Sequence, residues 1–309
     1  DLDGALFRFE RAIELSEAEG DLEELAWART NLGAVHHALG DTESAADLQR
    51  LSYAYFLKTG NRLGQCSANT RLGGLALARR DHEQAEERFL VSLAARRQIK
   101  DPWGTAYVLA ELGELRLLKD DVAAAESYLT ESLELVEEIG YLDGVARVND
   151  LLGQVAAARR EWELAHNRFA SSLAAARKVG SRHGIAIALA HLARAEAELG
   201  RTTSARRLSL EAFQVAEEAG DPRSIVSALD AVAAFLAATH QPEQAAMVTE
   251  LAASLRRDND IPMRPLASPR RGLFGGRRRG HATRRVPATE IDAEELRRVV
   301  DEALAATPG

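Results

Sequence analysis

The chain has 309 residues, of which 46% are hydrophobic and 28% charged, with a formal net charge of −8 and a single cysteine. This length and composition can bury a large core, whereas one cysteine excludes an internal disulfide and a multi-cysteine zinc site. No apolar run approaches the length of a membrane span, so we expect no membrane partner and a reducing, cytoplasmic location.

The charge is strongly segregated along the chain. Eight arginines lie between Arg264 and Arg285, so the other residues together carry about −16. An acidic body of this kind is a poor general binder of phosphate backbones.

A repeat of 40 residues organises the first 258 positions. An alanine recurs seven times at this interval, at Ala5, Ala45, Ala85, Ala125, Ala165, Ala205 and Ala245. A second column is apolar and precedes a small residue: Leu32, Leu72, Leu112, Leu152, Leu192 and Val232, followed by Gly33, Gly73, Gly113, Gly153, Ala193 and Ala233. A third column is always small: Ala12, Ser52, Ser92, Ser132, Ser172, Ala212 and Ala252. A fixed period of this length indicates a repeat architecture.

Within each unit, apolar and small positions fall three and four residues apart, which is the period of amphipathic helices. Each unit therefore predicts two helices. We expect glycines to end many of them, namely Gly20, Gly40, Gly60, Gly140, Gly180, Gly200 and Gly220. Pro102, Pro222 and Pro242 stand at predicted first helical positions, where a missing N–H costs nothing. We expect Gly33 and its equivalents to face the small residues of the second helix, because helices approach closely where side chains are small.

These columns predict four segments. Residues 1–20 form a lone second helix, residues 21–258 six helix pairs, residues 259–289 a disordered linker rich in proline, arginine and glycine, and residues 290–306 a C-terminal helix. A half repeat exposes an uncovered apolar face. We therefore expect the chain to be the C-terminal part of a longer protein.

Two segments carry a resemblance to a known family. "NLGAVHHALGDTESAADLQRLSYAYFLKTGN" and "ELGELRLLKDDVAAAESYLTESLELVEEIGY" resemble tetratricopeptide repeats, in which Leu-Gly in the first helix is followed by alanine, an aromatic or large apolar residue and a small residue in the second. Phe9, Phe89 and Phe169 occupy the aromatic position, and Gln49 departs from it. The resemblance implies an all-α, right-handed α–α superhelix, a tetratricopeptide solenoid of six helix pairs plus an N-terminal half repeat.

The spacing and the tail resemble particular subclasses. Repeats of 40 residues are similar to those of bacterial signal-transduction ATPases and of eukaryotic polarity scaffolds. "AAMVTELAASLRRDNDIPMRPLASPRR" is similar to the ending of large bacterial regulators related to the maltose and antibiotic-synthesis activators. This resemblance implies an upstream ATPase and a DNA-binding domain in the full-length chain.

The resemblance also implies a concave groove lined by the first helix of each pair, which would bind a protein or peptide. The candidate groove residues are Asn31, Arg71, Tyr107, Glu111, Glu114, Asp150, Gln154, His191 and Arg194. Trp27, Arg147 and Asp230 lie in the same columns. We expect Asn31 to hydrogen-bond a bound backbone and the charged positions to set selectivity. The alternative is a solvated inner face that binds nothing in particular.

No phosphate loop, nucleophile elbow or metal-ligand spacing occurs, so we predict no enzyme, no cofactor and no metal site. His36 and His37 are adjacent on a predicted helix and diverge by about 100°, so they share an ion poorly. Asp120 and Asp121 fall at a turn, where capping explains them. Cys66 aligns with alanines and is expected to be a packed core thiol.

The basic stretch "SPRRGLFGGRRRGHATRR", residues 268–285, could attach to nucleic acid or an anionic membrane. Its seven arginines are Arg270, Arg271, Arg277, Arg278, Arg279, Arg284 and Arg285. Only Phe274 could stack on a base, and glycine and proline argue against a fixed recognition helix. We interpret the stretch as a flexible linker and leave contact with the acidic body open.

The leading functional hypothesis is the sensory or interaction arm of a larger bacterial transcriptional regulator. Two alternatives are a free-standing scaffold that assembles partners, and an array delivered to nucleic acid by its arginine tail.

Overall fold

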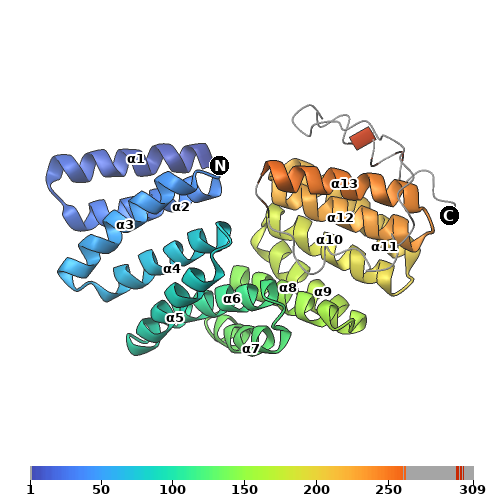
Figure 1. Ribbon diagram of the computed structural model, residues 1–309, viewed down its shortest axis with the longest axis horizontal. Helices are drawn as coiled ribbons and strands as arrows, with labels where there is room; N and C mark the ends of the chain where they lie inside the picture. The colour runs from blue at the N-terminus through green and yellow to red at the C-terminus, as the bar shows by residue number, and fades with distance from the viewer. Residues whose placement is uncertain (1, 260, 262–296, 299, 301, 303–309) are drawn as a thin grey trace. The chain divides into compact units, whose positions relative to one another are not determined.

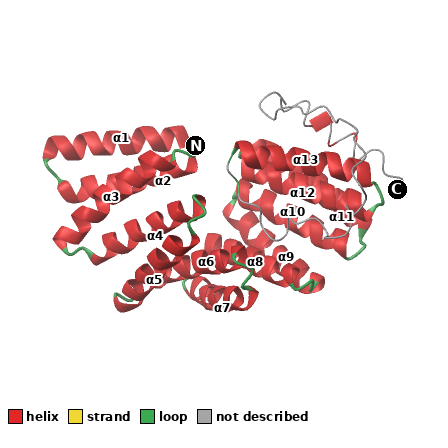
Figure 2. Ribbon diagram, in the orientation of Figure 1, coloured by secondary structure: helices red, strands yellow, loops and turns green. Residues whose placement is uncertain are grey.

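The computed structural model describes residues 2–259, 261, 297, 298, 300 and 302. This part of the chain contains thirteen α-helices and no strand (Figures 1 and 2). The helices are α1 (Leu2–Glu19), α2 (Leu22–Ala38), α3 (Thr42–Thr59), α4 (Arg62–Ala78), α5 (His82–Gln98), α6 (Pro102–Leu118), α7 (Val122–Glu138), α8 (Leu142–Ala158), α9 (Trp162–Val179), α10 (Arg182–Glu198), α11 (Thr202–Ala219), α12 (Pro222–Ala238) and α13 (Pro242–Asp258). Six helix pairs, from α2–α3 to α12–α13, therefore follow the single helix α1, as the 40-residue period predicts.

The helix ends follow from local sequence. Pro102, Pro222 and Pro242 each begin a helix. Aspartate, asparagine or serine side chains accept hydrogen bonds from the first turn at eight helix starts: Asp21, Asp41, Asn61, Asp81, Asp101, Asp121, Ser181 and Asp221. Such caps satisfy backbone N–H groups that have no partner within the helix. All seven glycines expected at helix ends have positive φ.

The chain forms two compact units. Unit 1 comprises residues 1–119 and 127–139, and unit 2 comprises residues 120–126 and 140–309. No helix of the described residues is long and apolar enough to cross a membrane.

The glycine column packs differently from the expectation. A Cβ on Gly73 would lie 2.6 Å from Cε1 of Phe89, and a Cβ on Gly153 would lie 2.4 Å from Cε1 of Phe169. The glycines therefore face the large residue of the second helix, not its small residues. The prediction was wrong because the space left by the missing Cβ is filled by a large side chain, which is a phenylalanine ring at Gly73 and Gly153, Leu129 at Gly113 and Gln49 at Gly33.

The small serines of the third column have a different task. Ser52 donates to the carbonyl of Ala26 at 2.9 Å, Ser92 to that of Cys66 at 3.1 Å, and Ser132 to that of Ala106 at 2.7 Å. The hydroxyl of the second helix thus binds the backbone of the first helix of the same pair. Since both groups are buried, this repeated bond satisfies a polar atom that packing removes from water.

The C-terminal part of the chain is described only in part. The predicted linker at 259–289 lies outside the described residues except for Asn259 and Ile261, and so do all seven arginines of the basic stretch. Within the predicted helix at 290–306, the four described residues are helical. Val300 is buried in the core cluster of unit 2, and Arg297 forms an ion pair with Glu217 of α11 at 2.8 Å.

Candidate functional site

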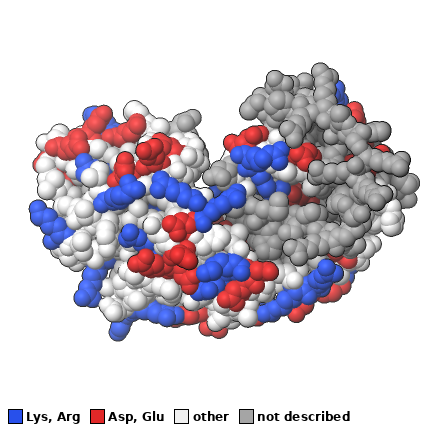
Figure 3. Space-filling model, viewed as in Figure 1, with Lys and Arg blue, Asp and Glu red and all other residues white. Residues whose placement is uncertain are grey.

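The sequence-predicted groove residues all lie on the first helix of a pair. Unit 1 holds Asn31 on α2, Arg71 on α4, and Tyr107, Glu111 and Glu114 on α6; unit 2 holds Asp150 and Gln154 on α8, and His191 and Arg194 on α10. In the view of Figure 3, basic and acidic side chains are interspersed over unit 1. No single-sign patch dominates that face.

Two aromatic side chains on α6 form an exposed surface in unit 1. The rings of Trp103 and Tyr107 stack with centroids 5.9 Å apart and planes 13° from parallel. Trp103 is 47% exposed and Tyr107 37%, although large aromatic rings gain most from burial. Leu63 stands one repeat before Trp103 and is 46% exposed. An apolar surface of this kind on the first helices suits a partner that covers it.

A charged pair of residues accompanies the aromatic surface. Burial lowers the pKa of the Arg71 guanidinium, while Tyr107 and Glu111 act in the opposite direction, so these three side chains are electrostatic neighbours. Glu111 is buried. Gly74, one turn beyond Arg71, has room for a Cβ, which would lie in ordinary van der Waals contact with Cε1 of His37 at 3.9 Å. Unit 1 therefore joins an aromatic surface to a partly desolvated arginine.

The other predicted residues of unit 1 are less exposed than a contact role suggests. Asn31 and Glu114 are half-buried. Trp27 packs on the buried ring of Phe56, with centroids 4.8 Å apart. Trp27 thus belongs mainly to the core of the first pair, and the partner contact expected of Asn31 stays a prediction.

In unit 2 the predicted residues form an internal polar network. His191 Nδ1 lies 2.6 Å from Oδ1 of Asp150, and Gln154 donates to Oδ2 of the same carboxylate at 2.8 Å. The His191 ring also contacts Phe169, with centroids 5.1 Å apart. Gln154 is buried, with 1% of its surface exposed. Both oxygens of Asp150 therefore have partners from the protein. Gln154, which is buried, fixes the orientation of the Asp150 carboxylate.

A second carboxylate lies farther along the same face of unit 2. Asp230 on α12 forms an ion pair with Arg256 on α13. Burial raises the pKa of Asp230 above its usual value, although Arg256, Arg194 and His191 act in the opposite direction. The candidate residues His191 and Arg194 are thus electrostatic neighbours of Asp230, which links the networks of α8, α10 and α12.

One cluster in unit 2 contains the residue types of a nucleophilic triad. His183 Nδ1 lies 3.0 Å from Asp221 Oδ2 and 3.0 Å from Ser224 Oγ, and Ser224 also hydrogen-bonds Asp221. A triad needs the serine and the carboxylate on opposite ring nitrogens. Here both contact the same nitrogen, and Ser224 is fully buried. The cluster caps α12 and is not arranged for catalysis.

The histidine pair and the cysteine also have structural environments. His36 Nδ1 lies 3.2 Å from Asp41 Oδ2, and both histidines of the pair are half-buried. Cys66 is buried, and burial raises the pKa of its thiol. Over the described ranges, no group of three or more His, Cys, Asp or Glu residues could hold a metal ion.

Sequence reasoning missed two residues of these faces. Trp103 precedes Tyr107 by four residues, so the helical period places them on one face, and this spacing could have revealed it. Arg256 had no such signal, because its partner Asp230 lies 26 residues away on another helix.

No protein-family model and no curated protein sequence matches the chain. Solved structures do match it. A Rap protein complexed with competence and sporulation factor aligns with a TM-score of 0.63 and 14% identity over 84% of this chain and 78% of that one. Aspartyl phosphate phosphatase F from Bacillus subtilis aligns with a TM-score of 0.65 and 15% identity, over 82% and 69%.

A third solved structure is a signal-transduction ATPase with numerous domains from Pyrococcus horikoshii, which has a tetratricopeptide repeat sensor. It aligns with a TM-score of 0.59 and 18% identity over 80% of this chain, and the match spans 37% of that protein. The chain therefore has the all-α helical-repeat fold of tetratricopeptide proteins, which confirms the fold expected from the sequence. At these identities the similarity concerns the fold alone.

Proposed function

We propose that this chain is a protein- or peptide-binding module that uses the first-helix face of unit 1. The observation that carries the proposal is the exposed, stacked pair of Trp103 and Tyr107 next to Arg71. Tryptophan, tyrosine and arginine are the residues that most often dominate binding energy at protein interfaces. A half-buried guanidinium and two exposed rings on neighbouring helices offer both apolar contact and directed hydrogen bonds.

Two of the similar structures support a binding role for this fold. One Rap protein was solved in complex with competence and sporulation factor, and the repeats of the Pyrococcus protein are described as a sensor. A third similar structure is named a phosphatase, so the alternative function is that of an enzyme. We favour binding, because the described Ser-His-Asp cluster has the geometry of a helix cap.

The finer proposal is that the module is the sensory arm of a larger bacterial transcriptional regulator. The Pyrococcus ATPase supports it, because that protein has a tetratricopeptide repeat sensor and the match spans 37% of its chain. The test is the neighbouring coding sequence. An in-frame nucleotide-binding ATPase with a DNA-binding domain would support the regulator, and a complete reading frame without either would favour a scaffold.

The binding face is tested with selected peptides. Random peptides displayed on phage are selected on the purified protein, and dissociation constants of synthetic peptides are then measured for Trp103→Ala and Arg71→Ala. We expect each substitution to weaken binding at least about tenfold, the range of interface hot spots. Phe7→Ala is the matched control, because Phe7 is a 70% exposed aromatic residue elsewhere in unit 1. Equal affinities for all variants would reject this face.

A further inference from the structure

An ion pair recurs between successive helix pairs. Glu86 on α5 binds Lys119, which follows α6, at 2.8 Å, and it also binds Arg116. Forty residues later, Glu126 on α7 binds Arg159, which follows α8, at 2.6 Å. Hydrogen bonds from these cations hold the pKa of both carboxyl groups below the usual range. The second helix of one pair thus supplies a carboxylate to a cation at the end of the next first helix.

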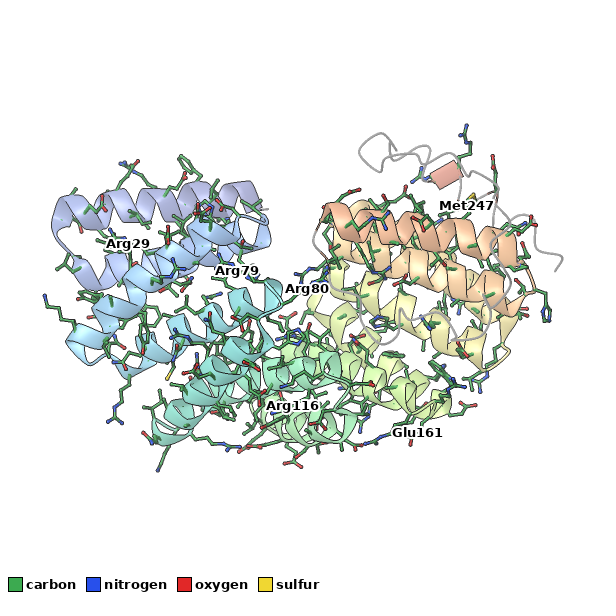
Figure 4. The ribbon with its side chains drawn as sticks, in the orientation of Figure 1. Arg29, Arg79, Arg80, Arg116, Glu161 and Met247 are labelled. Atoms are coloured by element: carbon green, nitrogen blue, oxygen red, sulfur yellow. The ribbon has the colours of Figure 1, made fainter. Side chains whose placement is uncertain are left out.

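One repeat earlier, the cation is present without the carboxylate. Arg79 ends α4 at the position of Lys119, and both Arg79 and Arg116 are labelled in Figure 4. The position of Glu86 is taken by Ala46. Arg79 donates to the carbonyl of Thr42 at 3.0 Å, and it has no carboxylate partner among the described residues. Replacement of glutamate by alanine therefore leaves both positive charge and space.

That space is a pocket of about 270 Å³ between α3, α4 and α5 in unit 1. Leu72 and Leu75 line its apolar side, while Arg50, Tyr53, Arg79 and Arg88 supply polar groups. The next repeat has no such basic lining, because Leu90, Leu93 and Tyr128 stand at the positions of Arg50, Tyr53 and Arg88. The basic lining is therefore specific to the contact between the pairs α2–α3 and α4–α5.

The arginines differ in what already binds them. Arg50 pairs with Asp47 on its own helix. Arg88 donates to Oδ1 of Asn69 at 2.9 Å, a neutral partner that orients its guanidinium, and within the described part of the chain it forms no ion pair. Two guanidinium groups in the pocket lining, those of Arg79 and Arg88, are therefore not neutralised. Guanidinium groups bind carboxylate and phosphate through paired hydrogen bonds.

We propose that this pocket binds a small organic anion, with its carboxylate or phosphate between Arg79 and Arg88 and its apolar part against Leu72 and Leu75. The anion takes the place of the glutamate that the next two repeats carry. The volume is slightly below the usual range for small-molecule sites, which suits a ligand of one ring or a short chain. The site lies between α3 and α5 and is independent of the Trp103 face.

The test measures binding of four probes to the purified full chain by NMR or calorimetry at fixed ionic strength. The probes are phenyl phosphate, benzoate, inorganic phosphate and benzylamine. We expect saturable one-to-one binding of phenyl phosphate and benzoate, binding of inorganic phosphate at least about tenfold weaker, and no binding of benzylamine. If inorganic phosphate bound as tightly as phenyl phosphate, the proposed apolar contact with Leu72 and Leu75 would be overturned. If none of the anions showed saturable binding, the proposed anion site itself would be overturned.

Two substitutions and a matched control locate the binding. Ala46→Glu supplies the carboxylate of the following repeats, so we expect it to pair with Arg79, raise the melting temperature and weaken phenyl phosphate binding at least tenfold. Arg79→Ala should weaken binding equally without unfolding the chain, because Arg79 is exposed. Lys119→Ala removes the equivalent cation, which Glu86 already neutralises, and should leave binding unchanged.

The control also separates a site from diffuse attraction. An equal loss of affinity in Lys119→Ala and Arg79→Ala would show that only overall charge matters, and would overturn the proposal. Unchanged affinity in Arg79→Ala would do the same, even if Ala46→Glu proved unable to fold.

Discussion

Two adjacent glycines on α4 differ in the room that they leave for a Cβ. A Cβ on Gly73 would lie 2.6 Å from Phe89 Cε1, whereas a Cβ on Gly74 would meet nothing closer than His37 Cε1 at 3.9 Å. The first glycine receives an aromatic ring from the second helix, and the second has room for a Cβ in ordinary contact with His37. The same substitution at these two neighbouring positions should therefore have different effects on stability.

This difference predicts opposite effects of one substitution. Gly73→Ala should destabilise unit 1 by about 1 to 3 kcal/mol, the usual cost of overpacking a core. Gly74→Ala should raise stability by up to about 1 kcal/mol, because alanine has the higher helix propensity. Urea denaturation of the two variants checks both signs, and a loss of stability in Gly74→Ala would show that a Cβ is not accommodated beside His37.

Asp221 makes stability depend on pH in the acid range. Burial raises the pKa of Asp221, but hydrogen bonds from His183 and Ser224 lower it more, so that the pKa falls from 3.8 to about 2. A depressed pKa in the folded state means that the stabilisation is complete above the unfolded value of 3.8. The stabilisation is lost as the pH falls through about 2.

We expect Asp221→Asn to remove this dependence. Asparagine retains a side-chain oxygen for the N-cap bond but cannot titrate. Between pH 4 and pH 2 the wild type should lose about 1 to 2 kcal/mol more stability than the variant, a range reduced for partial exposure to solvent. Chemical denaturation at both pH values checks it, and parallel pH profiles would show that Asp221 does not contribute.

At the scale of the helix, the turns use two kinds of residue in one backbone conformation. Gly60, Gly180 and Gly220 end their helices in the left-handed region. Five other residues also have positive φ: Arg80, Lys100, Asp120, Arg160 and His240. A side chain with a Cβ is strained in this region, whereas glycine is not.

Substitutions at two helix ends test this strain. Lys100, with φ of 54°, stands at the end of a second helix, as Gly60 does with φ of 70°. Lys100→Gly should increase the free energy of unfolding by up to about 1 kcal/mol and so raise the melting temperature. Gly60→Ala should decrease the free energy of unfolding by a similar amount and lower the melting temperature. Calorimetry of both variants gives the comparison. Destabilisation by Lys100→Gly would mean that the lysine side chain contributes more than the strain costs.

At the scale of the whole molecule, each repeat contacts mainly its neighbours, so stability is approximately a sum of local terms. Phe56 on α3 and Phe213 on α11 are both buried, one in each unit. Loss of either ring costs about 3 to 5 kcal/mol in an ordinary core. The consequences should therefore remain within the unit that carries the substitution.

Hydrogen exchange measured by mass spectrometry checks this expectation. Phe213→Ala should accelerate amide exchange in α10, α11 and α12 and leave α2 to α5 nearly unchanged. Phe56→Ala should show the reverse pattern. Equal acceleration across both units in either variant would indicate one cooperative unit rather than two.

Helix number, helix ends and the buried columns were predictable from the amino-acid sequence alone. Caps such as Asp101, the prolines that begin helices and the spacing of three and four residues act over one or two turns, so they are readable locally. The 40-residue register of Ala45 and its equivalents extends this local information to the whole array. The first-helix location of Arg71 and Tyr107 follows from the same register.

Only the tertiary structure decided which side chains meet between helices. The fit of Phe89 on Gly73, the contact of His191 with Asp150, and the lone cation of Arg79 beside Ala46 all depend on helix packing. A column in the sequence shows that a position is small or charged, but it does not name its partner 16 to 41 residues away. Packing geometry sets those distances, and it therefore determines which polar groups are satisfied internally and which can receive a ligand.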